Sequence, residues 1–98
     1  MKEDRAKSFA LLVKSAQQDY RLAQALLFST YSRGDAKAGV AQDKIEAYKW
    51  FLIGVGVIEI PEPYVDRTKH ITETMTPAEI SDAKKLAEDW MAKNRKKR

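Results

Sequence analysis

The sequence predicts an all-α protein of about five helices. Apolar residues recur at spacings of three and four along most of the chain, which is the period of one helix face and not the alternation of a strand. Residues that favour helix ends stand at the borders of these stretches. The 98 residues, of which 44% are apolar and 33% charged, suit one compact domain, because a domain typically takes about 100–200 residues. We therefore treat residues 1–98 as a single helical domain.

Two helices are predicted in the first third of the chain. The first covers about residues 2–17, and its repeating positions are Phe9, Leu12, Val13, Ala16 and then Tyr20. The polar run 17–19 interrupts this pattern. A second helix then extends to Gly34, a residue suited to the left-handed position that ends many helices. Its stripe is formed by Leu22, Ala23, Leu26, Leu27, Thr30 and Tyr31.

A third helix is predicted after a connection over residues 34–42, which has two glycines and no helical pattern. Asp43 stands three residues before Glu46, a spacing in which the first side chain caps the free amides and the acid reaches back. We expect the helix to begin there and to end at Gly56. Its inward face is expected to consist of Ala47, Gly54 and either Trp50 or Phe51.

Residues 57–75 are predicted to form a proline-containing connection. Pro61 and Pro63 argue against a central strand, since proline cannot donate to a sheet ladder. We expect an extended crossing packed by Val57, Ile58 and Ile60. A shorter helix is allowed after Pro63 by the spacing of Tyr64, Val65, Ile71 and Met75.

The closing helix, over residues 76–94, has the clearest start. Thr76 is a capping residue, Pro77 follows at the first helical position, and Glu79 stands three residues after the cap. The apolar positions Ile80, Ala83, Leu86, Ala87, Trp90 and Met91 then repeat at helical spacing. A basic tail, residues 95–98, follows.

A set of small, aromatic and glycine positions spans the second and third predicted helices: Ala23, Gln24, Leu27, Tyr31, Gly34, Gly39, Val40, Asp43, Ala47 and Trp50. This set resembles one copy of the Sel-one-like repeat, a relative of the tetratricopeptide repeat. The resemblance covers about residues 16–56, and the repeat itself is assigned to residues 20–56. Residues 47–51 are its most specific part. Residues 75–92 loosely resemble the segment that often follows the last repeat.

The resemblance implies a short tetratricopeptide-like α-solenoid. Residues 1–17 would be the degenerate remnant of a preceding repeat. Because repeat arrays usually need about three units to bury a continuous core, the first and closing helices must act as caps, or a second molecule must. Members of the family generally act as adaptors that bind other proteins, and in bacteria they occur in signalling, secretion and envelope-linked pathways. The resemblance therefore implies a non-enzymatic scaffold with a protein or peptide partner.

Two departures from the family pattern are visible. Phe28 stands where the family usually has a glycine, and the connection after Gly34 is about three residues longer. A large ring at a position the family keeps small is either a strained core residue or a partner contact. We expect Phe28, with Gln24 and Tyr20 behind it on the same helix face, to line the concave side and bind the partner.

Composition excludes several classes of protein. With no Cys, the chain has no disulfide, no zinc–thiolate cluster and no thiol nucleophile. The longest apolar or glycine run, residues 50–58, is far shorter than the roughly 18 residues of a membrane span. The charged residues 1–7 lack the features of a secretory signal. We therefore expect a cytoplasmic protein without a membrane span.

The net charge of +4 is concentrated at one end. Lys93, Arg95, Lys96, Lys97 and Arg98 alone supply five positive charges, so that residues 1–92 carry a formal charge of −1. Arg95, Lys96, Lys97 and Arg98 are candidate phosphate contacts, because basic clusters bind nucleic acids through counterion release. The tail lacks interleaved aromatic residues for base stacking. A solvated tail is the preferred interpretation, and a small nucleic-acid-associated protein is the alternative.

No residue set supports catalysis, and no cofactor is expected. His70 is the only histidine, and a base without a placed nucleophile does not make a catalytic site. Asp66, His70 and Glu73 share one face of a predicted helix and would offer a weak metal half-site. A solvated helix face is the preferred interpretation, so we expect no metal. A third functional alternative is self-association, because pairing two copies as a homodimer would bury an uncovered helix face.

Overall fold

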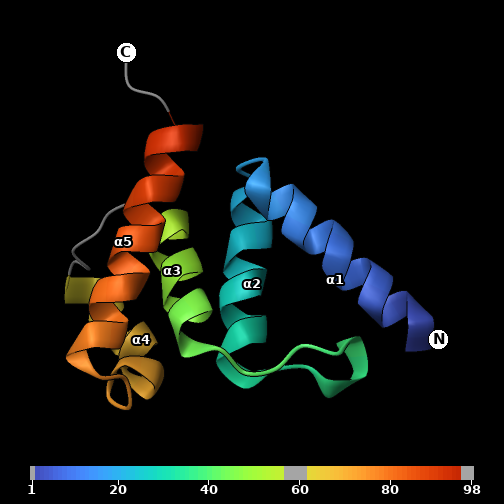
Figure 1. The fold of residues 1–98 in the computed structure, drawn as a ribbon, viewed down its shortest axis with the longest axis horizontal. Coiled ribbons are helices and arrows are strands. Elements are labelled where there is room, and N and C mark those ends of the chain that lie inside the picture. The colour runs from blue at the N-terminus through green and yellow to red at the C-terminus, as the bar shows by residue number, and fades with distance from the viewer. Residues whose placement is uncertain (1, 57–61, 96–98) are drawn as a thin grey trace.

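The computed structural model describes residues 2–56 and 62–95 and consists of helices joined by short connections (Figure 1). Its five α-helices are α1 (Lys2–Gln17), α2 (Arg21–Arg33), α3 (Lys44–Val55), α4 (Glu62–Thr72) and α5 (Pro77–Asn94). A single 3-10 turn, η1 (Ala36–Ala38), lies between α2 and α3. Within these described residues there is no strand, only an isolated bridge between Asp35 and Val40. The predicted all-α class and the five helices are confirmed.

The helix ends follow the local signals in the sequence. Asp43 accepts a hydrogen bond from the Glu46 amide at 3.1 Å, which begins α3. Glu46 does not reach back as predicted, since its carboxylate lies 2.9 Å from the Lys49 ammonium. At α5 the capping box is complete, because the Glu79 amide donates to the Thr76 hydroxyl at 3.1 Å and the Thr76 amide donates to the Glu79 carboxylate at 2.9 Å. The 3-10 turn η1 is the one element that the sequence did not predict among those described.

The helices form a row in which α1 packs on α2, α2 on α3, and α3 on α5 (Figure 1). The short helix α4 also packs against α3. The Cα radius of gyration is 13.4 Å, close to the ~13 Å expected of a compact domain of this length. The expected crossing by Val57, Ile58 and Ile60 lies outside the described residues.

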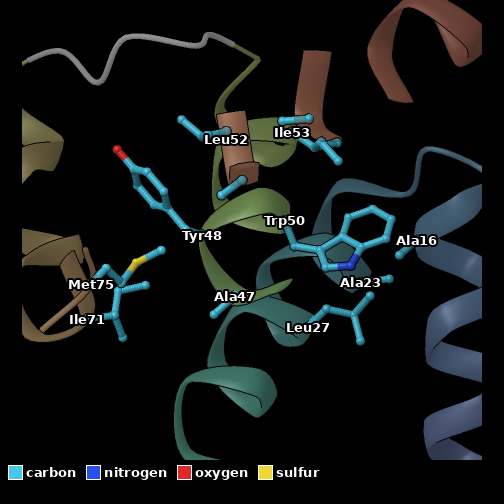
Figure 2. Close-up of a cluster of buried hydrophobic side chains, with 12 residues drawn as sticks. Ala16, Ala23, Leu27, Ala47, Tyr48, Trp50, Leu52, Ile53, Ile71 and Met75 are labelled. Atoms are coloured by element: carbon cyan, nitrogen blue, oxygen red, sulfur yellow. The ribbon is translucent and has the colours of Figure 1, made fainter. Parts of the chain in front are cut away.

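The centre of the row is α3, whose middle segment, residues 47–53, is buried except at the partly covered Lys49. Its buried side chains are Ala47, Tyr48, Trp50, Phe51, Leu52 and Ile53. A helix with apolar residues on several sides has to be covered on each of them, because any such side left in water would expose apolar surface. Tyr48 and Trp50 leave α3 on different sides, Tyr48 toward Ile71 and Met75 and Trp50 toward Leu27 (Figure 2).

The predicted inward face of α3 therefore included too few residues. Both Trp50 and Phe51 are buried, and each meets an aromatic ring of a different helix. The Trp50 ring lies 5.6 Å from that of Trp90 in α5, and the Phe51 ring lies 4.9 Å from that of Phe28 in α2. Apolar residues that recur every 3.6 positions identify one contact face of a helix. Because α3 has neighbours on several sides, this pattern identified only part of its buried surface.

The close approach of α2 and α3 depends on Ala23 and Ala47, which are 2% and 0% exposed. Gly54 is the other small residue on the predicted inward face of α3. A Cβ atom at Gly54 would lie 3.9 Å from the Gln24 Cβ, which is an ordinary contact distance. Gly54 is therefore not required for the helices to meet.

Gly34 is the glycine on which the α2–α3 connection depends. Its φ of 80° and ψ of 164° lie in a region that is essentially restricted to glycine. A Cβ atom there would come within 2.9 Å of the Gln42 backbone nitrogen. Gly39, which ends η1, is also left-handed at φ 76°, but a Cβ atom there would meet nothing within 4 Å.

We predict that Gly34→Ala lowers the free energy of unfolding by about 3 kcal/mol, since strain and a backbone clash act together. The matched control Gly39→Ala should cost about 1 kcal/mol, because it meets only the strain of the left-handed conformation. Urea denaturation of the two variants checks this. Equal losses at the two positions would contradict the described path of the connection.

Candidate functional site

The turn between α1 and α2 brings a carboxylate to one end of the row. Asp19 adopts a left-handed conformation, with φ 69°. Its amide donates to the Ala16 carbonyl at 3.0 Å, and the Tyr20 amide donates to the Ser15 carbonyl at 3.1 Å. This is the hydrogen-bond pattern that ends many helices, and aspartate tolerates the position better than most residues. The turn therefore holds the Asp19 side chain in one place.

Arg95, one residue beyond α5, reaches this carboxylate from 76 positions away in the sequence. Its Nε donates to Asp19 Oδ1 and Oδ2 at 3.0 and 2.9 Å. Its Nη1 donates to the Ile53 carbonyl at 2.9 Å, and its Nη2 to Gln24 Oε1 at 3.3 Å. The guanidinium also lies 5.4 Å from the centre of the Trp90 ring. We call Arg95, Asp19 and Gln24 the clasp, because together they tie the α1–α2 turn to the ends of α3 and α5.

Gln24 completes the clasp from inside α2. The side chain is fully buried, and its amide donates to the Ala16 carbonyl at 3.0 Å and to Asp19 Oδ1 at 3.1 Å. Its carbonyl oxygen accepts from Arg95. A buried amide without partners would be costly, and none of the buried side-chain polar atoms in the described part of the chain lacks one.

A cleft of about 370 Å³ opens beside the clasp, between α2 and the carboxyl half of α3. We call it the α2–α3 cleft, and its lining residues are Arg21, Ala25, Phe28, Trp50, Phe51, Gly54 and Val55. Most of these side chains are apolar, and aromatic rings form much of the lining. Such a cleft fits an apolar side chain better than a polar one.

One positive charge at the rim of the α2–α3 cleft is left unbalanced. Arg21 lies 3.4 Å from Asp19, and Arg95 contacts the same carboxylate. Two guanidinium groups thus share one carboxylate. Arg21 also donates to the Gly54 carbonyl at 3.2 Å, which holds its side chain beside the opening. An anionic group of a ligand would be attracted to this rim.

The three predicted partner-binding residues do not share one exposed face. Tyr20 is 59% exposed and lies in the turn, Phe28 is half-buried, and Gln24 is in the interior. Tyr20 precedes α2, so helical spacing does not relate it to the other two. Phe28 is the member that lines the α2–α3 cleft, and its ring lies 6.0 Å from that of His70.

The predicted basic tail begins with a residue that is not free. Arg95 was expected among the phosphate contacts, but its side chain is only 18% exposed and is engaged in the clasp. The other three, Lys96, Lys97 and Arg98, lie outside the described residues. The sequence did not indicate that Arg95 belongs to the clasp, because an arginine beside lysines at a helix end is typical of a solvated tail.

Within the described ranges, no group of three metal-ligating side chains lies close enough together to hold an ion. Asp66 lies 3.9 Å from the Lys69 ammonium, and the His70 ring lies against Phe28. None of the helices described is long and apolar enough to cross a bilayer.

Comparison of the chain with models of known protein families, with curated proteins and with solved structures found no match.

The clasp shifts the ionisation of Asp19. Hydrogen bonds from Arg95 are the main cause that lowers the pKa of this carboxyl from 3.8 to about 2, against the opposing effect of burial. Gln24 and the charge of Arg21 add to the lowering. A lowered pKa means that the folded protein holds the Asp19 proton less tightly than the unfolded chain. The clasp therefore stabilises the fold above about pH 4, and this contribution is lost as the pH falls to about 2.

We predict that Asp19→Asn lowers the free energy of unfolding by about 1–2 kcal/mol at neutral pH, after allowing for partial solvent screening of a side chain that is 33% exposed. Asparagine also tolerates the left-handed conformation, so the variant isolates the charge. The difference from wild type should shrink below about pH 4 and be largely lost as the pH falls through about 2. Urea denaturation at neutral and acid pH measures it. Asp66→Asn, at an 89% exposed carboxylate, is the control and should have no effect. An Asp19→Asn loss that is the same at both pH values would contradict the clasp.

Proposed function

We propose that the protein is a non-enzymatic interaction module that binds a segment of another protein in the α2–α3 cleft. The observation that carries the proposal is the cleft itself, an apolar hollow with a cationic rim. Its lining provides places for an apolar side chain beside Phe28, Phe51 and Val55. The rim arginine, Arg21, favours a carboxylate next to that side chain.

Two further points support a binding role over a catalytic one. The cleft contains an arginine and apolar side chains, but none of its lining residues is a general base or a nucleophile. Aromatic residues, phenylalanine among them, are enriched in protein interfaces. The partner that fits is a protein segment in which an aromatic or branched apolar residue stands next to an acidic one.

We further propose that the row of helices is a short array of the Sel-one-like type. Helices α1, α2 and α3 pack on one another in chain order, as helices do in a stacked array, and α5 packs on α3 rather than on α4, its neighbour in the chain. In this assignment α2 and α3 are the repeat pair, and α1 and α5 cover its two sides. The proposal rests on this order of packing and on the resemblance of residues 20–56.

The alternative of nucleic-acid binding through the tail is weakened by the clasp. A cluster of four basic residues would offer four phosphate contacts, but Arg95 is engaged with Asp19 and Gln24. The number of cations that can release counterions falls accordingly.

A variant that fills the cleft without disturbing the core tests the proposed function. Ala25 is exposed and lines the cleft, so Ala25→Trp should leave the melting temperature within a few degrees of wild type and block the partner. Ala78→Trp, at an exposed position in the first turn of α5, is the matched control. We predict that wild type and Ala78→Trp retain the same protein from nuclease-treated lysate, and that Ala25→Trp retains less than a tenth as much.

Two results would contradict the proposal. One is equal retention by all three proteins, which would place binding elsewhere. The other is retention of material that disappears after nuclease treatment, which would favour the nucleic-acid alternative.

A further inference from the structure

The outer side of α1 presents an exposed leucine between two lysines. Leu11 is 65% exposed, with Lys7 four residues before it and Lys14 three residues after it, both exposed. At about 100° per residue, the three lie within about 60° of one another around the helix axis. Lys14 forms no ion pair with a residue whose side chain the structure describes, and residues 5–18 contain no acidic side chain. We call Lys7, Leu11 and Lys14 the α1 face.

A face of the same spacing and opposite charge lies on α5. Leu86 is 42% exposed, with Asp82 four residues before it and Asp89 three residues after it, both exposed. A shallow hollow of about 250 Å³ lies beside these residues, lined by Ile45, Asp82, Lys85, Leu86 and Asp89. Its two carboxylates outnumber its one ammonium, so its net charge is negative. We call Asp82, Leu86, Asp89 and Ile45 the α5 face.

The two faces match in dimensions as well as in charge. On each helix the charged residues are seven positions apart, which is about 10.5 Å along the axis, with the leucine between them. Lysines therefore meet aspartates whether the two helices run parallel or antiparallel. In the antiparallel case the leucines are offset by one residue, and the long lysine side chains can span that offset. Within one molecule the faces cannot meet, because α2 and α3 lie between α1 and α5 in the row (Figure 1).

We propose that the α1 face of one molecule docks on the α5 face of a second copy of this chain. Leu11 enters the hollow beside Ile45 and Leu86, and Lys7 and Lys14 pair with Asp82 and Asp89 of the other copy. Charge complementarity selects this occupant, because both halves of the contact are present on the same chain. The inference uses no residue of the α2–α3 cleft and does not depend on the proposed function.

This contact joins two different faces, so it is heterologous and leaves one face of each kind free at the ends of the assembly. Further copies then add to either end, and growth does not stop at a dimer unless the rotation between copies closes a ring. Because each exposed ion pair is weak and screened by salt, the association is expected to be weak and to fall with ionic strength.

Sedimentation velocity over protein concentrations from about 10 µM to about 1 mM tests the proposal. For wild type we expect the mean mass to rise with concentration beyond that of a dimer, and to fall when salt is raised to about 0.5 M. The proposal is overturned if the protein stays monomeric throughout this range, or if its mean mass does not change when salt is added.

Charge reversal identifies the two faces. The variant Lys7→Glu/Lys14→Glu and the variant Asp82→Lys/Asp89→Lys should each stay monomeric, with association weakened at least tenfold. An equimolar mixture of the two should regain association, because the acidic α1 face of one then meets the basic α5 face of the other. If either variant alone associates like wild type, or if the mixture stays monomeric, the proposed pairing is wrong.

A control separates this effect from net charge. Glu73→Lys/Glu88→Lys shifts the net charge as much as the α5 reversal, at exposed positions outside both faces, and should associate like wild type. Loss of association in this control would overturn the pairing. Circular dichroism checks that every variant keeps its helices. Should a double variant not fold, Leu11→Ser gives the same readout through the apolar half of the contact, and unchanged association in it overturns the proposal.

Discussion

The structure depends on the burial of the apolar sides of α3 against several neighbouring helices. Six side chains of this helix are buried, and fully burying a large apolar side chain contributes about 1.5–3 kcal/mol. No single neighbour covers a helix all round, so α2, α4 and α5 must each take a side. The aromatic pairs formed by Phe51 with Phe28 and by Trp50 with Trp90 are the contacts through which α2 and α5 do so. The order of the row follows from this requirement, with α1 left to pack on α2.

The clasp acts on a smaller scale than this burial but fixes the geometry at one end. A contribution of about 1–2 kcal/mol is well below that of the six buried α3 side chains together. Its effect is positional, because Arg95 brings the ends of α3 and α5 to the turn at Asp19 with directional hydrogen bonds. Arg21 shares the same carboxylate, so the clasp also sets the charge at the rim of the α2–α3 cleft. The fold and the candidate site are thus linked through one aspartate.

Local sequence patterns predicted the helices well, but they did not predict contacts between residues that are far apart in the sequence. Gly34, Gly56 and the Thr76 capping box marked helix ends that the structure confirms, because these signals act within a few residues. The pairing of Arg95 with Asp19 spans most of the chain, and nothing in either residue's neighbourhood indicates it. Gln24 was expected at a surface for the same reason, since a glutamine is usually exposed unless distant partners satisfy its amide. Of the residues that line the cleft, Phe28 is the one that the sequence singled out, because the resemblance to the Sel-one-like repeat predicts a small residue at that position.

Hydrogen exchange measured by mass spectrometry on dilute protein tests the central role of α3 most directly. The amides of α3 should exchange only when the whole molecule unfolds, with an opening free energy equal to that from urea denaturation. Those of α1, which packs only on α2 and η1 among its main contacts, should exchange sooner. If the α3 amides exchange as fast as those of α1, the helix is not the shared core and the account of the fold is wrong.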